Sequence, residues 1–186
     1  MKPVRRIAVI GAGAAGRAFA LRAAQAGFAV VLEDVMPHKL RRAQDEYAEL
    51  VSAAGSLDFV STVEDAVREA DLAIDFVPDE LESKLEIFSL LDRMAPPHTI
   101  LCTPTNALSM TDLASCTYRS AQCVGLRGEL LSGEVGIVTS RFLSADVAAA
   151  VAEFFSVMGV ASQIVEDREE PMLVKNVGVV TPNRVD

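Results

Sequence analysis

The chain has 186 residues, 51% of them hydrophobic and 23% charged, which predicts one folded domain with a large core and excludes intrinsic disorder for most of its length. The net charge of −9 argues against nucleic-acid binding, because that function leaves a basic surface. Cys102, Cys116 and Cys123 form no C-x-x-C pair, so they predict a reducing, cytoplasmic location rather than a disulfide framework. The longest uncharged run, 95–111, contains three prolines, so we expect no membrane span.

Short apolar runs with β-branched residues alternate with helical patterns along most of the chain. The predicted elements in chain order are strand 5–10, helix 14–26, strand 28–32, helix 37–54, strand 57–60, helix 63–70, strand 72–77, helix 79–94, strand 99–102, helix 109–114, strand 122–126, strand 135–139, a helix capped by Ser144, and strand 160–165. This alternation predicts an α/β fold of the Rossmann type, a doubly wound and mostly parallel sheet with helices on both faces. We expect this domain to cover 1–166 and residues 167–186 to form a charged linker and an apolar tail.

The turn between the first strand and the first helix reads Gly11-Ala12-Gly13-Ala14-Ala15-Gly16, a G-x-G-x-x-G pattern. Gly11 permits a tight turn, Gly13 lets the backbone approach a pyrophosphate, and Gly16 lets the helix pack closely on the strand. Free N–H groups at the start of the helix, where Ala14 and Ala15 lie, then meet the phosphates. The alternative is that these glycines only pack a helix on a sheet.

An acidic residue, Asp34, follows the second strand 23 residues after Gly11. A carboxylate there accepts hydrogen bonds from the adenosine ribose hydroxyls and repels a 2′-phosphate, so we expect NAD rather than NADP as the cofactor. Glu33 is the alternative for this role, and strand alternation places the two carboxylates on opposite faces.

Four stretches resemble the NAD-binding N-terminal domain of the 3-hydroxyacyl-CoA dehydrogenases, namely 7–13, 70–78, 86–96 and 103–113. The resemblance implies an NAD-dependent oxidoreductase of fatty acid metabolism that acts on acyl-CoA. In that family a helical C-terminal domain supplies much of the dimer contact and closes over the acyl-CoA. We expect that domain to be absent, since 186 residues leave no room for it.

The cofactor side of the family pattern is retained. Val77 and Pro78 fall at the strand end that lines the nicotinamide ribose in the family, and Asp79 replaces the usual Glu. Lys84 falls on the family's cofactor-proximal lysine. Its alternative is a solvated charge on a helix, the common state of lysine.

The catalytic side of the family pattern is not retained. Asn106 stands where the family has a substrate-binding Ser, and Arg127 stands where it has the catalytic His. The Glu that orients that His falls on Thr139 in an ungapped alignment, and the family's Pro-x-x-x-x-Asn survives as Pro171 to Asn176 only after a two-residue insertion.

The loss of the catalytic His matters because oxidation of an alcohol requires a base for the hydroxyl proton. Arginine stays protonated in proteins and is no base. Two histidines remain. His38 follows the second strand and His98 precedes the fifth, so we expect both at the surface.

Three functions stay open from the sequence. The first is an altered enzyme, in which Arg127 binds a carboxylate or phosphate and Glu129 or Glu134 is the base. The second is a non-catalytic NAD(H)-binding module, either a sensor or one part of a two-chain enzyme. The third is a truncated product whose catalytic remainder is absent. The apolar tail at 172–180 predicts a homodimer, with folding back on its own sheet or disorder as the alternative.

Overall fold

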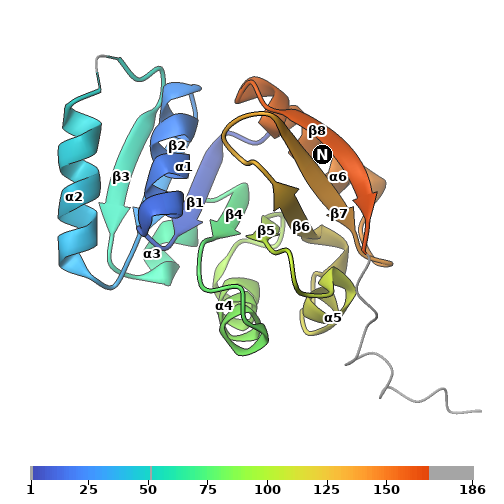
Figure 1. Ribbon diagram of the computed structural model, residues 1–186. Helices are drawn as coiled ribbons and strands as arrows, with labels where there is room; N and C mark the ends of the chain where they lie inside the picture. The colour runs from blue at the N-terminus through green and yellow to red at the C-terminus, as the bar shows by residue number, and fades with distance from the viewer. Residues whose placement is uncertain (1, 51, 168–186) are drawn as a thin grey trace, which may run out of the picture.

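The computed structural model describes residues 2–50 and 52–167 of the chain (Figure 1). The strands are β1 Arg6–Ile10, β2 Ala29–Glu33, β3 Ser56–Val60, β4 Leu72–Asp75, β5 Ile100–Pro104, β6 Cys123–Gly128, β7 Glu134–Thr139 and β8 Ala161–Glu166. The helices are α1 Ala14–Gln25, α2 Pro37–Ala48, α3 Val63–Val67, α4 Leu81–Met94, α5 Met110–Ser115 and α6 Ala145–Val157, with a 3-10 turn η1 at Ser120–Gln122.

The strands form one eight-stranded sheet in the order β3-β2-β1-β4-β5-β6-β7-β8. All neighbouring strands are parallel except β6 and β7, which form an antiparallel hairpin. The predicted doubly wound α/β fold is therefore confirmed. The strand order reverses between β1 and β4, which is where doubly wound sheets bind their ligands.

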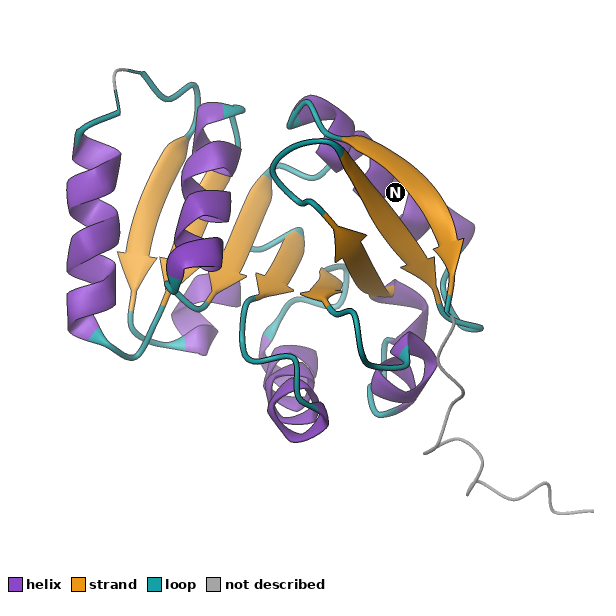
Figure 2. Cartoon of the chain, in the orientation of Figure 1, coloured by secondary structure: helices purple, strands orange, loops and turns teal. Residues whose placement is uncertain are grey.

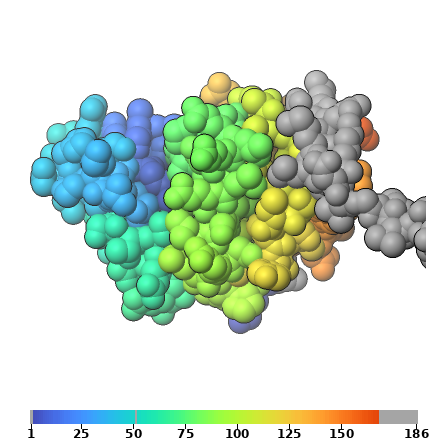
Figure 3. All heavy atoms as spheres, turned by 90° about the horizontal axis from the view of Figure 1, so that it is seen from below, coloured from blue at the N-terminus to red at the C-terminus, as the bar shows by residue number. Residues whose placement is uncertain are grey.

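The helices divide between the two faces of the sheet (Figure 2). Helices α1, α2 and α6 pack on one face, around a cluster that includes Phe19, Phe154 and Phe155. Helices α3, α4 and α5 cover the other face, where Phe88 and Leu91 are fully buried. Strands β1–β4 end at the lower side of Figures 1 and 2, and Figure 3 looks at the molecule from that side, with α4 between the α2 region and α5.

The second helix is shorter than predicted. The expected helix 37–54 ends at Ala48, because the chain must turn back to start β3 beside β2. Just before β3, a Cβ on Gly55 would lie 2.0 Å from the carbonyl oxygen of Phe28, so this close approach requires a glycine. The third helix likewise stops at Val67 rather than residue 70.

None of the helices in the described part of the chain is long and apolar enough to cross a bilayer.

The predicted linker and tail lie outside the described residues, apart from Asp167. That residue contacts the start of α5, through Ser109 and Thr111.

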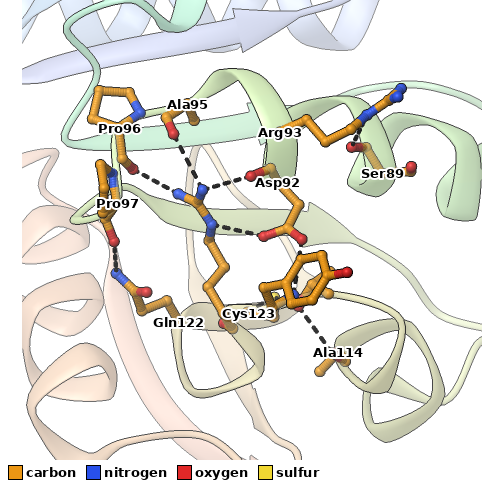
Figure 4. Close-up of polar contacts among 12 residues, drawn as sticks. Ser89, Asp92, Arg93, Ala95, Pro96, Pro97, Ala114, Gln122 and Cys123 are labelled. Atoms are coloured by element: carbon orange, nitrogen blue, oxygen red, sulfur yellow. Dashed lines mark hydrogen bonds and ion pairs between the residues drawn. The ribbon is translucent and has the colours of Figure 1, made fainter.

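A buried arginine joins α4 to the segment between α5 and β6 (Figure 4). The Arg119 guanidinium donates through Nε to Asp92 Oδ1 at 2.9 Å, through Nη1 to the Pro96 carbonyl at 2.6 Å and through Nη2 to the Asp92 carbonyl at 2.7 Å. The side chains of Arg119 and Asp92 are only 11% and 5% exposed. This cation satisfies carbonyl groups that the end of α4 leaves without helical partners.

Replacing Arg119 with alanine should lower the free energy of unfolding by about 3–5 kcal/mol, because it strands the buried Asp92 carboxylate and several carbonyls. Urea unfolding would measure this loss. Arg93→Ala is the matched control, since Arg93 is exposed and donates a hydrogen bond to the Ser89 carbonyl of its own helix, and it should change stability by less than about 0.5 kcal/mol. Equal losses in the two variants would contradict the assignment.

Candidate functional site

The turn between β1 and α1 has the geometry that a bound phosphate requires. Gly11 has φ +98°, a left-handed conformation that favours glycine, and a Cβ on Gly16 would lie 1.9 Å from the Gly11 carbonyl oxygen. A Cβ on Gly13 would meet nothing within 4 Å, so the space above the start of α1 is open. The predicted positions Ala14 and Ala15 form the first turn of α1, whose N–H groups face this space without a side-chain cap.

The Asp34 carboxylate is held beside this turn. Its Oδ2 accepts a hydrogen bond from the Ala12 N–H at 2.9 Å and its Oδ1 accepts one from the Met36 N–H at 2.9 Å. The Lys39 ammonium lies 3.1 Å from Oδ2. The end of β2 and the glycine turn are thus joined through one carboxylate, at the position expected for ribose recognition.

Two neighbouring carboxyl groups have opposite pKa shifts here. Burial acts to raise the pKa of Asp34, but the N–H groups of Met36 and Ala12 and the Lys39 ammonium outweigh it, so that pKa lies below its usual value. Burial and the Asp34 charge raise the pKa of Glu33 to about 7. Glu33 is 4% exposed and lies on the same face as Val31, toward α3 and α4. Asp34, rather than Glu33, therefore presents a stable anion to the turn.

Lys84 is buried, so the alternative of a solvated helix charge is wrong. Its ammonium lies 2.7 Å from Asp75 Oδ1, and the two side chains are 1% and 0% exposed. Burial raises the pKa of Asp75, although the Lys84 charge opposes this shift. The same Oδ1 accepts a hydrogen bond from the Val77 N–H at 3.3 Å. Lys84 thus supports the loop after β4 through Asp75.

The loops after β4 and β5 are also joined to each other, at the carboxyl ends of these two central strands. The exposed Asp79 carboxylate accepts a hydrogen bond from the Asn106 N–H at 2.9 Å. A cavity of about 230 Å³ lies beside the β4 loop and is lined by Val77, Pro78, Ser83, Glu86, Ile87 and Leu90. The predicted nicotinamide-side residues Val77, Pro78 and Asp79 are therefore joined to Asn106, the residue at the position of the family's substrate-binding Ser.

Arg127, at the end of β6, reaches a carboxylate that the sequence placed in the linker. Its Nη2 lies 3.9 Å from Asp167 Oδ1, and the side chains are 18% and 7% exposed. Asp167 Oδ2 accepts hydrogen bonds from the Ser109 hydroxyl at 3.2 Å and the Thr111 N–H at 2.8 Å. This pair stands beside the start of α5, where no sequence signal linked its two members.

Thr139 does not face Arg127. The hairpin pairs Gly125 with Val138 and Arg127 with Gly136, so these four residues share one face. Thr139 follows Val138 and lies on the other face, where its hydroxyl donates to the Val165 carbonyl at 3.2 Å. The two positions aligned with the family's His and Glu are therefore on opposite faces of the sheet.

The other candidate acid–base groups lie at the surface. Glu129 and Glu134 are exposed in or next to the loop between β6 and β7, and Glu134 accepts a hydrogen bond from the Gln163 side chain. His38 and His98 are exposed as predicted, and His98 lies 3.5 Å from Asp71 at the amino ends of the strands. Asn176 lies outside the described residues.

Comparisons with known proteins agree with this geometry. The sequence pattern of the family described as 3-hydroxyacyl-CoA dehydrogenase, NAD binding domain, matches residues 6–127. A probable 3-hydroxybutyryl-CoA dehydrogenase of Bacillus subtilis (strain 168) is 33% identical in an alignment that covers 66% of this chain and 48% of that protein. The mitochondrial hydroxyacyl-coenzyme A dehydrogenase of Homo sapiens is 32% identical in an alignment that covers 66% of this chain and 46% of that protein.

A solved structure extends the likeness. The 3-hydroxybutyryl-CoA dehydrogenase from Escherichia coli K12 matches with a TM-score of 0.79 at 25% identity, over 89% of this chain and 39% of that one. The chain spans about half the length of the curated relatives it matches.

The fold and the site together define a dinucleotide-binding domain, because a glycine turn, an open helix start and a held acid converge where the strand order reverses. The chain belongs to the 3-hydroxyacyl-CoA dehydrogenase family and contains its NAD-binding domain. The cofactor is NAD, as predicted. The residues present fit it: the open glycine turn would hold the pyrophosphate, and Asp34 would hold the adenosine ribose.

The raised pKa of Glu33 predicts a pH-dependent stability. The folded-state pKa of about 7 lies above the ordinary value of 4.5, so folding favours the protonated form and stability is lost as pH rises from about 4.5 to 7. Glu33→Gln should therefore match the wild type near pH 4 and exceed it by roughly 2–3 kcal/mol above pH 7. Denaturant unfolding across this range would measure the difference. The exposed Glu153→Gln should show no such trend, and a pH-independent difference for Glu33→Gln would contradict the prediction.

Proposed function

We propose that this protein is an NAD(H)-binding member of the family that is weak or inactive in the family's dehydrogenase reaction and acts as a binding module or sensor of the cofactor. The observation that carries the proposal is the Arg127–Asp167 pair at the position of the family's catalytic His. The cofactor side of the site supports binding, since its glycine turn and Asp34 are in place.

The chemistry follows from what each residue can do with a proton. NAD accepts a hydride from a carbon that bears a hydroxyl, and that step needs a neighbouring base for the hydroxyl proton. An arginine guanidinium donates hydrogen bonds and does not act as a base. The Asp167 side chain is 7% exposed, accepts from Ser109 and Thr111, and lies 3.9 Å from the Arg127 guanidinium. Asp167 therefore holds the start of α5, and Arg127 supplies no base.

Direct assay tests this proposal. NADH formation with a panel of 3-hydroxyacyl-CoA substrates should be absent or about 10²–10⁴-fold below that of an enzyme that retains the base. The Bacillus subtilis relative provides the positive control. Robust turnover that Glu129→Gln or Glu134→Gln abolishes would overturn the proposal and identify an altered enzyme with a surface carboxylate as its base.

The proposal extends to ligand and compartment. An acyl-CoA or another small acid is the ligand class that the family relationship favours, and Arg127 is the cation that would meet a carboxylate or phosphate. A cytoplasmic location is consistent with all three cysteines being free, two of them buried.

The proposed assembly is a homodimer held by the apolar residues at 172–180, which lie outside the described part of the chain. Light scattering should give a dimer for the full chain at micromolar concentration and a monomer for a chain that ends at Asp167, which keeps the contacts of Asp167 with α5. A full-length monomer, or a dimer that survives truncation, would refute this assembly.

A further inference from the structure

The adenosine end of the site contains a cation as well as the acid. Lys39 is the third residue of α2, and its ammonium lies 3.1 Å from Asp34 Oδ2 while its side chain remains 40% exposed. Nothing in the glycine pattern or in the position of Asp34 indicates this contact, because it depends on how α2 begins. The contact places a positive charge where the ribose hydroxyls approach Asp34.

This contact limits what Asp34 can offer a ribose. A carboxylate has about four acceptor positions, and the N–H groups of Ala12 and Met36 and the Lys39 ammonium use three of them. Two ribose hydroxyls would therefore compete with Lys39 for the remaining capacity. The ammonium has three donors, so those that do not contact Asp34 are available to a hydroxyl or a phosphate oxygen.

The start of α2 adds to the positive potential at this point. The helix has 12 residues, begins at Pro37, and has no side-chain cap at Met36. The start of α2 therefore places the positive end of its helix dipole beside Lys39. Asp34 opposes a 2′-phosphate, whereas Lys39 and this helix end attract one.

We propose that Lys39 is a second determinant of cofactor choice, which attracts a 2′-phosphate and so weakens the discrimination against NADP(H) that Asp34 imposes. The site therefore favours NADH by a smaller margin than Asp34 alone would produce. Removing the cation leaves the carboxylate unopposed and sharpens the preference for NADH.

Calorimetric titration of the full chain with NADH and NADPH tests this inference. Lys39→Gln should increase the ratio of the NADPH Kd to the NADH Kd by roughly fivefold, the effect of losing one half-exposed charge contact. Arg41→Gln is the matched control, because Arg41 is an exposed cation two residues along the same helix. It makes the same change of charge and should leave the ratio within about twofold of the wild type. Lys39→Arg should also preserve the ratio.

A second pair of variants separates the cation from the acid. Asp34→Asn should lower the ratio of the NADPH Kd to the NADH Kd while Lys39 is present. This decrease should be smaller in the double variant Asp34→Asn, Lys39→Gln. Thermal unfolding without nucleotide checks that the variants fold.

The outcomes distinguish this inference from the cofactor assignment on which it rests. If Lys39→Gln gives the same ratio of NADPH Kd to NADH Kd as Arg41→Gln, or a ratio below that of the wild type, the role of Lys39 is overturned and the cofactor assignment stands. A wild type that binds neither nucleotide would overturn both assignments.

Discussion

The contact between the two ends of the glycine turn is the constraint on which the rest of this site depends. The Cβ that Gly16 lacks would lie 1.9 Å from the Gly11 carbonyl oxygen, so α1 can approach the end of β1 only because no side chain is there. That approach leaves the first N–H groups of α1 open and directs the Ala12 N–H toward Asp34. Strand β2, the adenosine end and the start of α2 are positioned through this one carboxylate.

Buried charge in this protein is neutralised by partners from other elements. Lys84 of α4 pairs with Asp75 of β4, and Arg119 pairs with Asp92. Each pair holds a loop or a helix end in place, since an unpaired buried charge is strongly destabilising. The Lys84–Asp75 pair thus supports the cofactor side of the sheet, and the Arg119–Asp92 pair holds the end of α4 on the opposite side.

The Arg127–Asp167 pair follows the same pattern where the family has its acid–base chemistry. Arg127 lies opposite Gly136 on the same face of the hairpin, and that glycine has no side chain to compete for the space. A guanidinium at this position places a positive charge 3.9 Å from the Asp167 carboxylate and supplies no base.

The sequence predicted the periodic and local features well. Alternating strand and helix patterns defined the α/β fold, and the glycine turn with Asp34 defined the cofactor end, because these signals lie within one βαβ unit. The predicted helix 37–54 was too long. The chain leaves the helix early to bring Gly55 against Phe28, just before the paired strands β3 and β2, and the local sequence pattern does not encode that contact.

The tertiary structure alone decided which charges meet. Asp75 and Lys84 are nine residues apart and Arg127 and Asp167 forty, and nothing in their spacing indicates a pair. The structure also placed Thr139 on the face opposite Arg127, which an ungapped alignment could not reveal. Motifs within a turn are readable from sequence because the chain itself brings their residues together. Contacts between elements depend on sheet order, register and face, which only the folded chain determines.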